Sequence, residues 1–201
     1  DIGFQLGPRI NAIGRIGDPQ VVIQLLTTED LETAYELAQE CEDTNRYRQQ
    51  LCKEIEAEAI VICEEQAHRI PEDKVLVVMR EDWHHGVIGL VASRLVDRYG
   101  VPVFIATLEN ETHIRGSARG IPEFNVFEAL EYSKDLLDRH GGHPAAGGFS
   151  LSTENLGAFR QRLIEFANQS LSPQHLKPLV NLDGEADRKS TRLNSSHSDR
   201  S

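Results

Sequence analysis

The chain has 201 residues, a hydrophobic fraction of 39% and a formal net charge of −11. This composition excludes a disordered chain, and no apolar run is long enough to span a membrane. The negative charge, most of which lies in residues 28–66, excludes a nucleic-acid binder that acts through a broadly basic surface. We therefore expect a cytoplasmic protein in which any nucleic-acid contact depends on a few placed side chains.

The first part of the chain is rich in glycine and proline. Residues 1–18 are predicted to form loop and turn because these residues recur through them, and Arg9 and Arg15 lie among the glycines. Residues 20–27 follow as a short apolar piece. The chain does not begin with Met, so we expect native sequence before it.

A long helix is predicted for residues 29–66. This segment contains neither Gly nor Pro, and its apolar residues recur at steps of three and four. We allow for a break near Asn45. Such a helix would span about 55 Å, which is typical of a connector between lobes. Its cysteines, Cys41, Cys52 and Cys63, would share one face about 16 Å apart, too far for a disulfide or a shared metal, so we interpret them as buried apolar residues.

Strands and helices alternate after residue 71, which predicts an α/β lobe over about 71–170. We expect strands at 75–79, 101–108, 114–119 and 145–151, and helices at 86–99, from Asn125 to near His140, and after Ser152. Residues 173–186 resemble the first strand of a further domain. The serine-rich tail at 187–201 is predicted to be disordered, and we interpret it as non-native.

One predicted strand carries a candidate phosphate clamp. Ser117 and Arg119 point to the same face of a strand, and Arg115 falls on that face too. A hydroxyl beside guanidinium groups is suited to phosphate, so these three residues and Gly116 are candidate binding residues. The alternative is an exposed polar edge strand.

A glycine-rich segment, residues 141–148, is a second candidate. Its small side chains let the backbone approach a ligand closely. His143 is its only side chain able to donate to a phosphate or move a proton, so Gly141, Gly142 and His143 are candidate site residues. The alternative is a glycine-rich turn with a capping histidine.

A third candidate is the turn at His84, which leads from a strand into a helix. Helix N-termini bind anions through free N–H groups, and His84 would add a side-chain contact. The alternative is that His84 only caps the helix. No cluster of carboxylates and histidines suited to Mg²⁺ or Mn²⁺ is evident, so we assign no metal ligand in this chain.

Four segments, taken in order, resemble the RecJ family of single-stranded-DNA-specific exonucleases in the DHH phosphoesterase superfamily. They are residues 7–15 (Gly-Pro-Arg-Ile-Asn-Ala-Ile-Gly-Arg), 83–95 (beginning Trp-His-His-Gly-Val), 116–119 (Gly-Ser-Ala-Arg) and 141–147 (Gly-Gly-His-Pro-Ala-Ala-Gly). The resemblance covers about residues 1–186, all but the tail.

The resemblance implies an α/β fold in which a long connector helix precedes a small mixed-sheet lobe, the DHH-associated domain. Residues 1–18 would end the catalytic DHH lobe, 19–70 would form the connector helix, 71–152 the DHH-associated nucleic-acid-binding domain, and 153–186 a helix and the start of an OB-like region. Ligands for a divalent metal, Mn²⁺ or Mg²⁺, would lie in a preceding lobe outside this chain, so we expect the chain to be inactive alone.

The implied function is the substrate-binding part of a 5′-to-3′ exonuclease that acts in DNA repair and recombination by two-metal hydrolysis. By resemblance, Ser117 and Arg119 match residues that hold the 5′ phosphate of single-stranded DNA. His143 matches a catalytic motif that faces the active site across the cleft. His84 matches the tryptophan–histidine–glycine pattern of the family, whereas His85 falls where the family varies.

By the same resemblance, Arg9 and Arg15 lie in the stretch that lines the DNA path, and the sequence does not decide which one touches DNA. Two alternatives to the exonuclease remain open. One is a phosphodiesterase for short oligonucleotides or cyclic dinucleotides from the same superfamily. The other is a non-catalytic protein, either a DNA-binding scaffold or an acidic α/β module that binds another protein.

Overall fold

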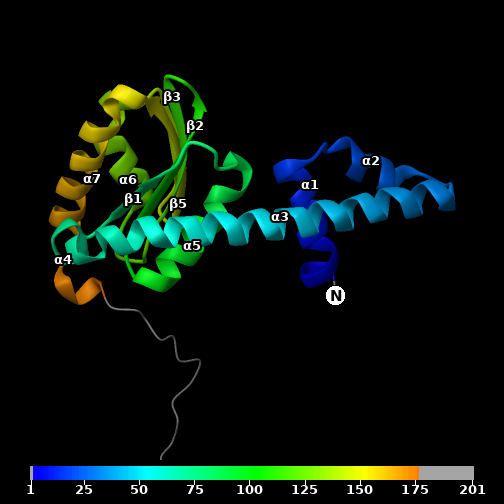
Figure 1. The fold of residues 1–201 in the computed structure, drawn as a ribbon, viewed down its shortest axis with the longest axis horizontal. Coiled ribbons are helices and arrows are strands. Elements are labelled where there is room, and N and C mark those ends of the chain that lie inside the picture. Colours follow the sequence, from blue (N-terminus) through cyan, green and yellow to red (C-terminus); the bar gives the residue numbers. More distant parts are fainter. Residues whose placement is uncertain (1, 177–201) are drawn as a thin grey trace, which may run out of the picture.

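The computed structural model describes residues 2–176. Helix α3 (Leu31–Gln66) runs along the long axis of the molecule. Helices α1 (Gly7–Ile16) and α2 (Gln20–Thr27) pack on its N-terminal half, and an α/β lobe is built around its C-terminal half (Figure 1). None of the helices in the described residues is long and apolar enough to cross a membrane.

The prediction of loop and turn for residues 1–18 is wrong. A π-helical turn covers Ile2–Leu6, and α1 follows it directly. Proline is well suited to the first turn of a helix, and one occupies that place in α1. Ala12 and Ile13 are buried on the face of α1 that packs on α3, so tertiary packing outweighs the low helix propensity of the glycines.

Helix α3 is continuous over 36 residues, so the break allowed near Asn45 is absent. Asp30 caps its start by accepting a hydrogen bond from the Thr33 backbone N–H at 2.8 Å. The Asn45 side chain is buried and accepts from Arg48 at 3.0 Å, which satisfies it without interrupting the helix. All three cysteines on α3 are buried and free, as expected.

The lobe contains one five-stranded sheet with the order β1-β2-β3-β5-β4. Strands β1 and β2 are parallel and the other neighbours are antiparallel, which confirms a mixed sheet. Its elements are α4 (Ile70–Asp73), β1 (Leu76–Met79), α5 (His85–Tyr99), β2 (Val103–Asn110), β3 (His113–Arg119), α6 (Val126–Tyr132), β4 (Arg139–His143), β5 (Ala146–Ser152) and α7 (Leu156–Ser170), with 3₁₀ turns at Ala67–Arg69, Lys134–Leu136, Thr153–Asn155 and Pro173–His175.

The helix predicted from Asn125 to near His140 is too long. Helix α6 ends at Tyr132, and residues 139–143 form strand β4 instead. The buried Ser133 hydroxyl donates back to the Ala129 carbonyl at 3.0 Å just past the last helical residue. The chain is then free to pair with β5 in a hairpin in which only Pro144 and Ala145 connect the strands, so most of the glycine-rich segment lies in strands rather than in the turn left open as an alternative.

The two faces of the sheet are covered differently. Helices α6 and α7 cover one face over a core that includes a cluster of phenylalanine rings. Helices α3 and α5 cover the other face, but mainly over β1, β2 and part of β3. The remaining area of that second face, on β3, β5 and β4, carries the candidate site.

Helix α7 packs its buried residues, Phe159, Leu163 and Ala167, on the phenylalanine core of the lobe. The boundary expected at residue 152 therefore falls inside a continuous packing unit. Of the further strand expected at 173–186, the structure describes only a 3₁₀ turn at Pro173–His175. The rest of that segment and the tail at 187–201 lie outside the described residues.

Candidate nucleic-acid interface

A groove of about 880 Å³ lies over the uncovered part of the sheet. Its floor is formed by β3, β5 and β4, and its wall by the end of α1 and the start of α5. Basic side chains from three separate elements line it: Arg15 from α1, Arg115 from β3 and Arg139 from β4. Two carboxylates, Glu109 and Asp138, also line it, so the groove combines placed arginines with acidic groups on a chain whose net charge is strongly negative.

Strand β3 places Ser117 and Arg119 on the same face, as the alternation predicts. Both lie half-buried under the start of α5. A Cβ built on Gly89 would be 3.0 Å from the Arg119 Nη2 and 3.3 Å from the Ser117 Oγ. Glycine at this position thus lets α5 approach the sheet without displacing either polar side chain.

Arg15 of the groove wall lies near Arg119, which follows Ser117 on β3 just past the residues that line the groove. Burial, and then the nearby charge of Arg15, lower the pKa of Arg119 from its usual value, although an arginine stays charged. Neither Arg15 nor Arg119 forms an ion pair with a carboxylate among residues 2–176. A half-buried cation with an exposed cation beside it, and no carboxylate pairing with either, favours an anion between or beside them.

The close contact of α1 with α5 holds Arg15 in place. The Arg15 guanidinium donates to the Gly86 carbonyl at 3.3 Å. A Cβ on Gly86 would be 2.2 Å from the Arg15 carbonyl oxygen, so only glycine fits there. In the tryptophan–histidine–glycine segment, Gly86 therefore permits the close contact of α5 with α1, and Gly89 permits its close contact with β3.

His84 is the N-cap of α5: its Nδ1 accepts from the Gly86 backbone N–H at 3.1 Å. This is the capping alternative left open by the sequence, and the side chain is not among those that line the groove. The exposed neighbour His85 does line it. Desolvation, followed by the charge of Arg115, lowers the pKa of His85, so the ring is mainly neutral near pH 7.

The candidate glycines divide into two groups. A Cβ on Gly141 would meet nothing within 4 Å, and one on Gly148 only a carbonyl oxygen at 3.9 Å, so both leave open floor. By contrast, a Cβ on Gly116 would be 2.1 Å from the Phe149 ring, and one on Gly142 would be 2.3 Å from the Ala146 carbonyl oxygen. Gly142 also has a φ of +154°. Packing and backbone conformation thus account for these last two glycines.

His143 is exposed at the end of β4, opposite Ala146. Ala146 is in turn opposite Arg119 on β3, so His143 and Arg119 occupy the same transverse row of the sheet, two strands apart. His143 makes no side-chain hydrogen bond within residues 2–176. Its catalytic role stays a prediction.

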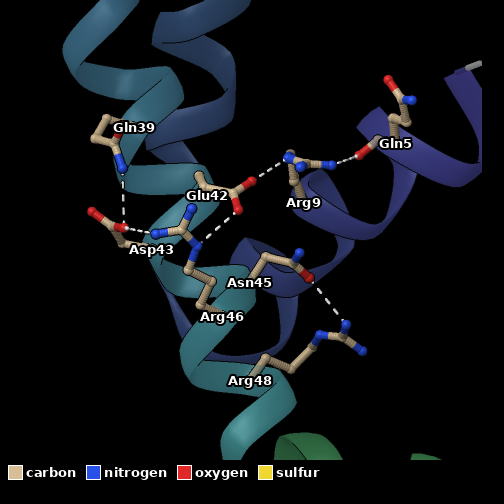
Figure 2. A network of polar contacts seen from close by, with 8 residues as sticks. All are labelled: Gln5, Arg9, Gln39, Glu42, Asp43, Asn45, Arg46 and Arg48. Carbon is tan, nitrogen blue, oxygen red and sulfur yellow. Dashed lines mark hydrogen bonds and ion pairs between the residues drawn. The ribbon is translucent and has the colours of Figure 1, made fainter.

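Arg9 is not among the residues that line the groove, and Figure 2 shows its side chain between Glu42 and Gln5. Its guanidinium pairs with Glu42 of α3 and also donates to the Gln5 carbonyl. Glu42 in turn accepts from Arg46 at 3.0 Å. These contacts join α1 to α3. The structure therefore distinguishes the surroundings of the two arginines, which the sequence left undecided: Arg15 lines the groove, and Arg9 lies in a polar network between helices.

Sequence reasoning missed Arg139, Ser150 and His85 as groove residues. The sequence pattern places Arg139 in a helix that ends at Tyr132 in the structure. Nothing in the pattern distinguishes Ser150 from its neighbours in β5. Residues 139–143 show no apolar–polar alternation that would have identified β4. Among residues 2–176, no group of three or more His, Cys, Asp or Glu side chains is placed to hold a metal ion.

Residues 72–169 match the family model of the DHHA1 domain. The chain carries a DHHA1 domain and is homologous to RecJ. The single-stranded-DNA-specific exonuclease RecJ of Bacillus subtilis is 39% identical over 183 residues, which are 90% of this chain and 23% of that protein. RecJ of Salmonella typhimurium is 35% identical over 191 residues, or 92% of this chain and 33% of that protein.

Solved structures agree with these relatives. The crystal structure of RecJ from Thermus thermophilus in complex with Mg²⁺ matches with a TM-score of 0.73 at 32% identity, covering 84% of this chain and 26% of that one. A structure of exonuclease RecJ bound to manganese matches with the same TM-score at 31% identity, covering 86% and 42%. The chain thus spans 23% and 33% of the length of these two curated relatives, and the resemblance to RecJ is confirmed.

Proposed function

We propose that this chain is the strand-gripping part of a single-stranded-DNA-specific exonuclease that degrades DNA in the 5′-to-3′ direction during repair and recombination. The groove over β3, β5 and β4 binds the strand, and Ser117, Arg119 and Arg15 hold its 5′ phosphate. The observation that carries this proposal is a pair of neighbouring arginines, Arg15 in the groove wall and Arg119 on β3 beyond Ser117, that lack a carboxylate partner among residues 2–176.

The chemistry of the groove supports an anionic strand as the ligand. Arginine offers a planar fork that suits phosphate oxygens, and a hydroxyl adds one more donor. The bare floor at Gly141 and Gly148 lets a sugar–phosphate backbone lie close to the sheet. Because acidic residues outnumber basic ones and the net charge is −11, recognition rests on these placed groups rather than on a general positive field.

Hydrolysis in the proposed enzyme requires a divalent metal, Mg²⁺ or Mn²⁺, as in the RecJ structures that contain these ions. The donor groups of residues 2–176 do not fit such a metal, so we derive no catalytic step through it in this chain. The contribution of these residues is to orient the strand and to stabilise negative charge on its phosphate. His143 is the residue we propose to face the reacting phosphate, and a cytoplasmic location stays a prediction.

The test is binding of the 201-residue chain to oligothymidylates with and without a 5′ phosphate, followed by fluorescence anisotropy. We expect tighter binding of the phosphorylated strand, and Arg119→Ala should abolish that preference. Arg98→Ala is the matched control, because Arg98 is exposed on α5 away from the groove and pairs with Glu64. Equal binding of both strands by the unchanged chain would refute the 5′-phosphate site, and a preference for dinucleotides over long strands would favour a short-oligonucleotide phosphodiesterase.

A further inference from the structure

The outer part of the groove contains a second set of polar groups in one transverse row. Arg115 on β3 is opposite Ser150 on β5, and Ser150 is opposite Arg139 on β4. Residues in register across neighbouring strands point to the same face, and all three line the groove. The two arginines are separated by two strand spacings, about 10 Å.

This outer row is displaced from the inner site along the strands. Arg119 and Arg115 are four residues apart on β3, so their rows are about 14 Å apart, with Ser117 half-way. Between the rows lies the bare floor at Gly141 and Gly148. A strand held at Arg119 by its end could cross this floor and bring a later phosphate to the outer row.

The charges of the outer row differ from those of the inner site. Arg115 pairs with Glu109 at 3.5 Å, and both side chains are about half exposed. Arg139 is exposed and has no ion pair among the described residues, but it follows Asp138, which also lines the groove. An incoming phosphate must therefore compete with a carboxylate for Arg115, whereas at Arg119 it meets no such competitor.

We propose that Arg139, Ser150 and Arg115 form a second subsite for a backbone phosphate of the strand, and that Glu109 weakens this subsite by holding Arg115. The inference rests on the proposed function, because it names the contacts of later nucleotides in the same groove. A weak outer subsite beside a strong inner one keeps the end of the strand in place, while the rest of the strand is released easily enough to advance.

The test compares two ligands, thymidine 5′-monophosphate and a 5′-phosphorylated oligothymidylate of about 12 nucleotides. Arg139→Ala should weaken oligonucleotide binding about fivefold, in line with the loss of one phosphate contact, and should leave the mononucleotide unaffected. Glu109→Gln should tighten oligonucleotide binding about two- to threefold at low salt, and this gain should disappear at high salt.

The chain provides a matched control for the second change. Arg98 and Glu64 also pair at 3.5 Å with both side chains about half exposed, but far from the groove. Glu64→Gln removes the same charge from the same kind of pair and should leave oligonucleotide binding nearly unchanged. If Glu109→Gln and Glu64→Gln have equal effects, the competition by Glu109 is refuted.

The two proposals fail in different ways. If Arg119→Ala weakens binding of both ligands but Arg139→Ala weakens neither, the outer subsite is wrong and the 5′-phosphate site stands. If Arg119→Ala has no effect on the mononucleotide, the proposed function itself is wrong. Thermal melting of each variant by circular dichroism checks the fold, and we expect Arg139→Ala to melt with the unchanged chain because its side chain is exposed.

Discussion

The two faces of strands β3 and β5 have the same backbone but opposite chemistry. On the covered face, Ile114, Ala118, Phe149 and Leu151 are buried under α6 and α7. On the other face, arginine, serine and glycine alternate with them and line the groove. Because side chains alternate along a strand, the apolar face fixes the register, and this register decides which polar groups meet in the groove.

The glycines show the same division between packing and access. Gly116 and Gly147 lie on the covered face, where a Cβ would be 2.1 Å from Phe149 and 2.7 Å from Leu130, respectively. Gly141 and Gly148 lie on the open face, where a Cβ has room. A glycine on the covered face thus serves the stability of the sheet, and a glycine on the open face serves the ligand.

The largest effect that tests this division is expected at Gly116. Gly116→Ala should lower the free energy of unfolding by about 1–3 kcal/mol, because the added methyl group overlaps the Phe149 ring and forces the core to shift. Gly148→Ala, on the open face opposite Ser117, should change the free energy by less than about 0.5 kcal/mol. Urea denaturation measures both, and equal losses would show that the two faces are not distinct in this way.

Oligonucleotide binding should respond in the reverse order. Gly148→Ala should weaken binding about threefold, because its methyl group stands on the floor where the strand must lie close to the sheet. The measurement is anisotropy with the phosphorylated oligothymidylate at one fixed salt concentration. Unchanged affinity in Gly148→Ala would mean that the strand does not approach this part of the sheet.

The two arginines of α1 provide a smaller, matched test of the same separation. Arg15→Ala should weaken oligonucleotide binding about fivefold and leave stability nearly unchanged, because this side chain lines the groove and is exposed. Arg9→Ala should leave binding unchanged and lower the free energy of unfolding by roughly 0.5–1 kcal/mol, since its pair with Glu42 is only partly exposed. The opposite pattern would place Arg9, not Arg15, on the path of the strand.

Much of the lobe follows from sequence pattern because its elements are strongly periodic. Apolar runs identify β1 and β2, alternation identifies the common face of Arg115, Ser117 and Arg119, and absence of Gly and Pro identifies α3. These are local signals that the tertiary structure reinforces. The groove residues on β3 could therefore be predicted before the structure was known.

The rest depends on contacts that are distant in sequence. Strand β4 forms because it pairs with β5. The local pattern of the residues before it favours a helix, and no local pattern marks the strand. Helix α1 is stabilised by burial against α3, which overrides its glycines. For the same reason, the different surroundings of Arg9 and Arg15 could not be deduced from their shared segment.

The smallest effect is expected at the edge of the covered face, where Glu131 of α6 lies 2.6 Å from His140 of β4. The hydrogen bond with His140, assisted by the charges of His140 and Lys134, lowers the pKa of Glu131 below its usual value. The folded state thus binds this proton less tightly than the unfolded chain. The resulting stability is present above the usual glutamate range, about pH 4.3, and is lost as the pH falls through the lowered pKa.

Replacing the carboxylate removes this pH-dependent contribution. Glu131→Gln should be slightly less stable than the unchanged chain at neutral pH, and the difference should vanish as the pH falls below the usual glutamate range. Glu123→Gln is the control, because Glu123 has no side-chain polar partner among residues 2–176. Urea midpoints measured at a series of pH values give the comparison, and a difference that grows on acidification would show that the pair with His140 does not stabilise the charged carboxylate.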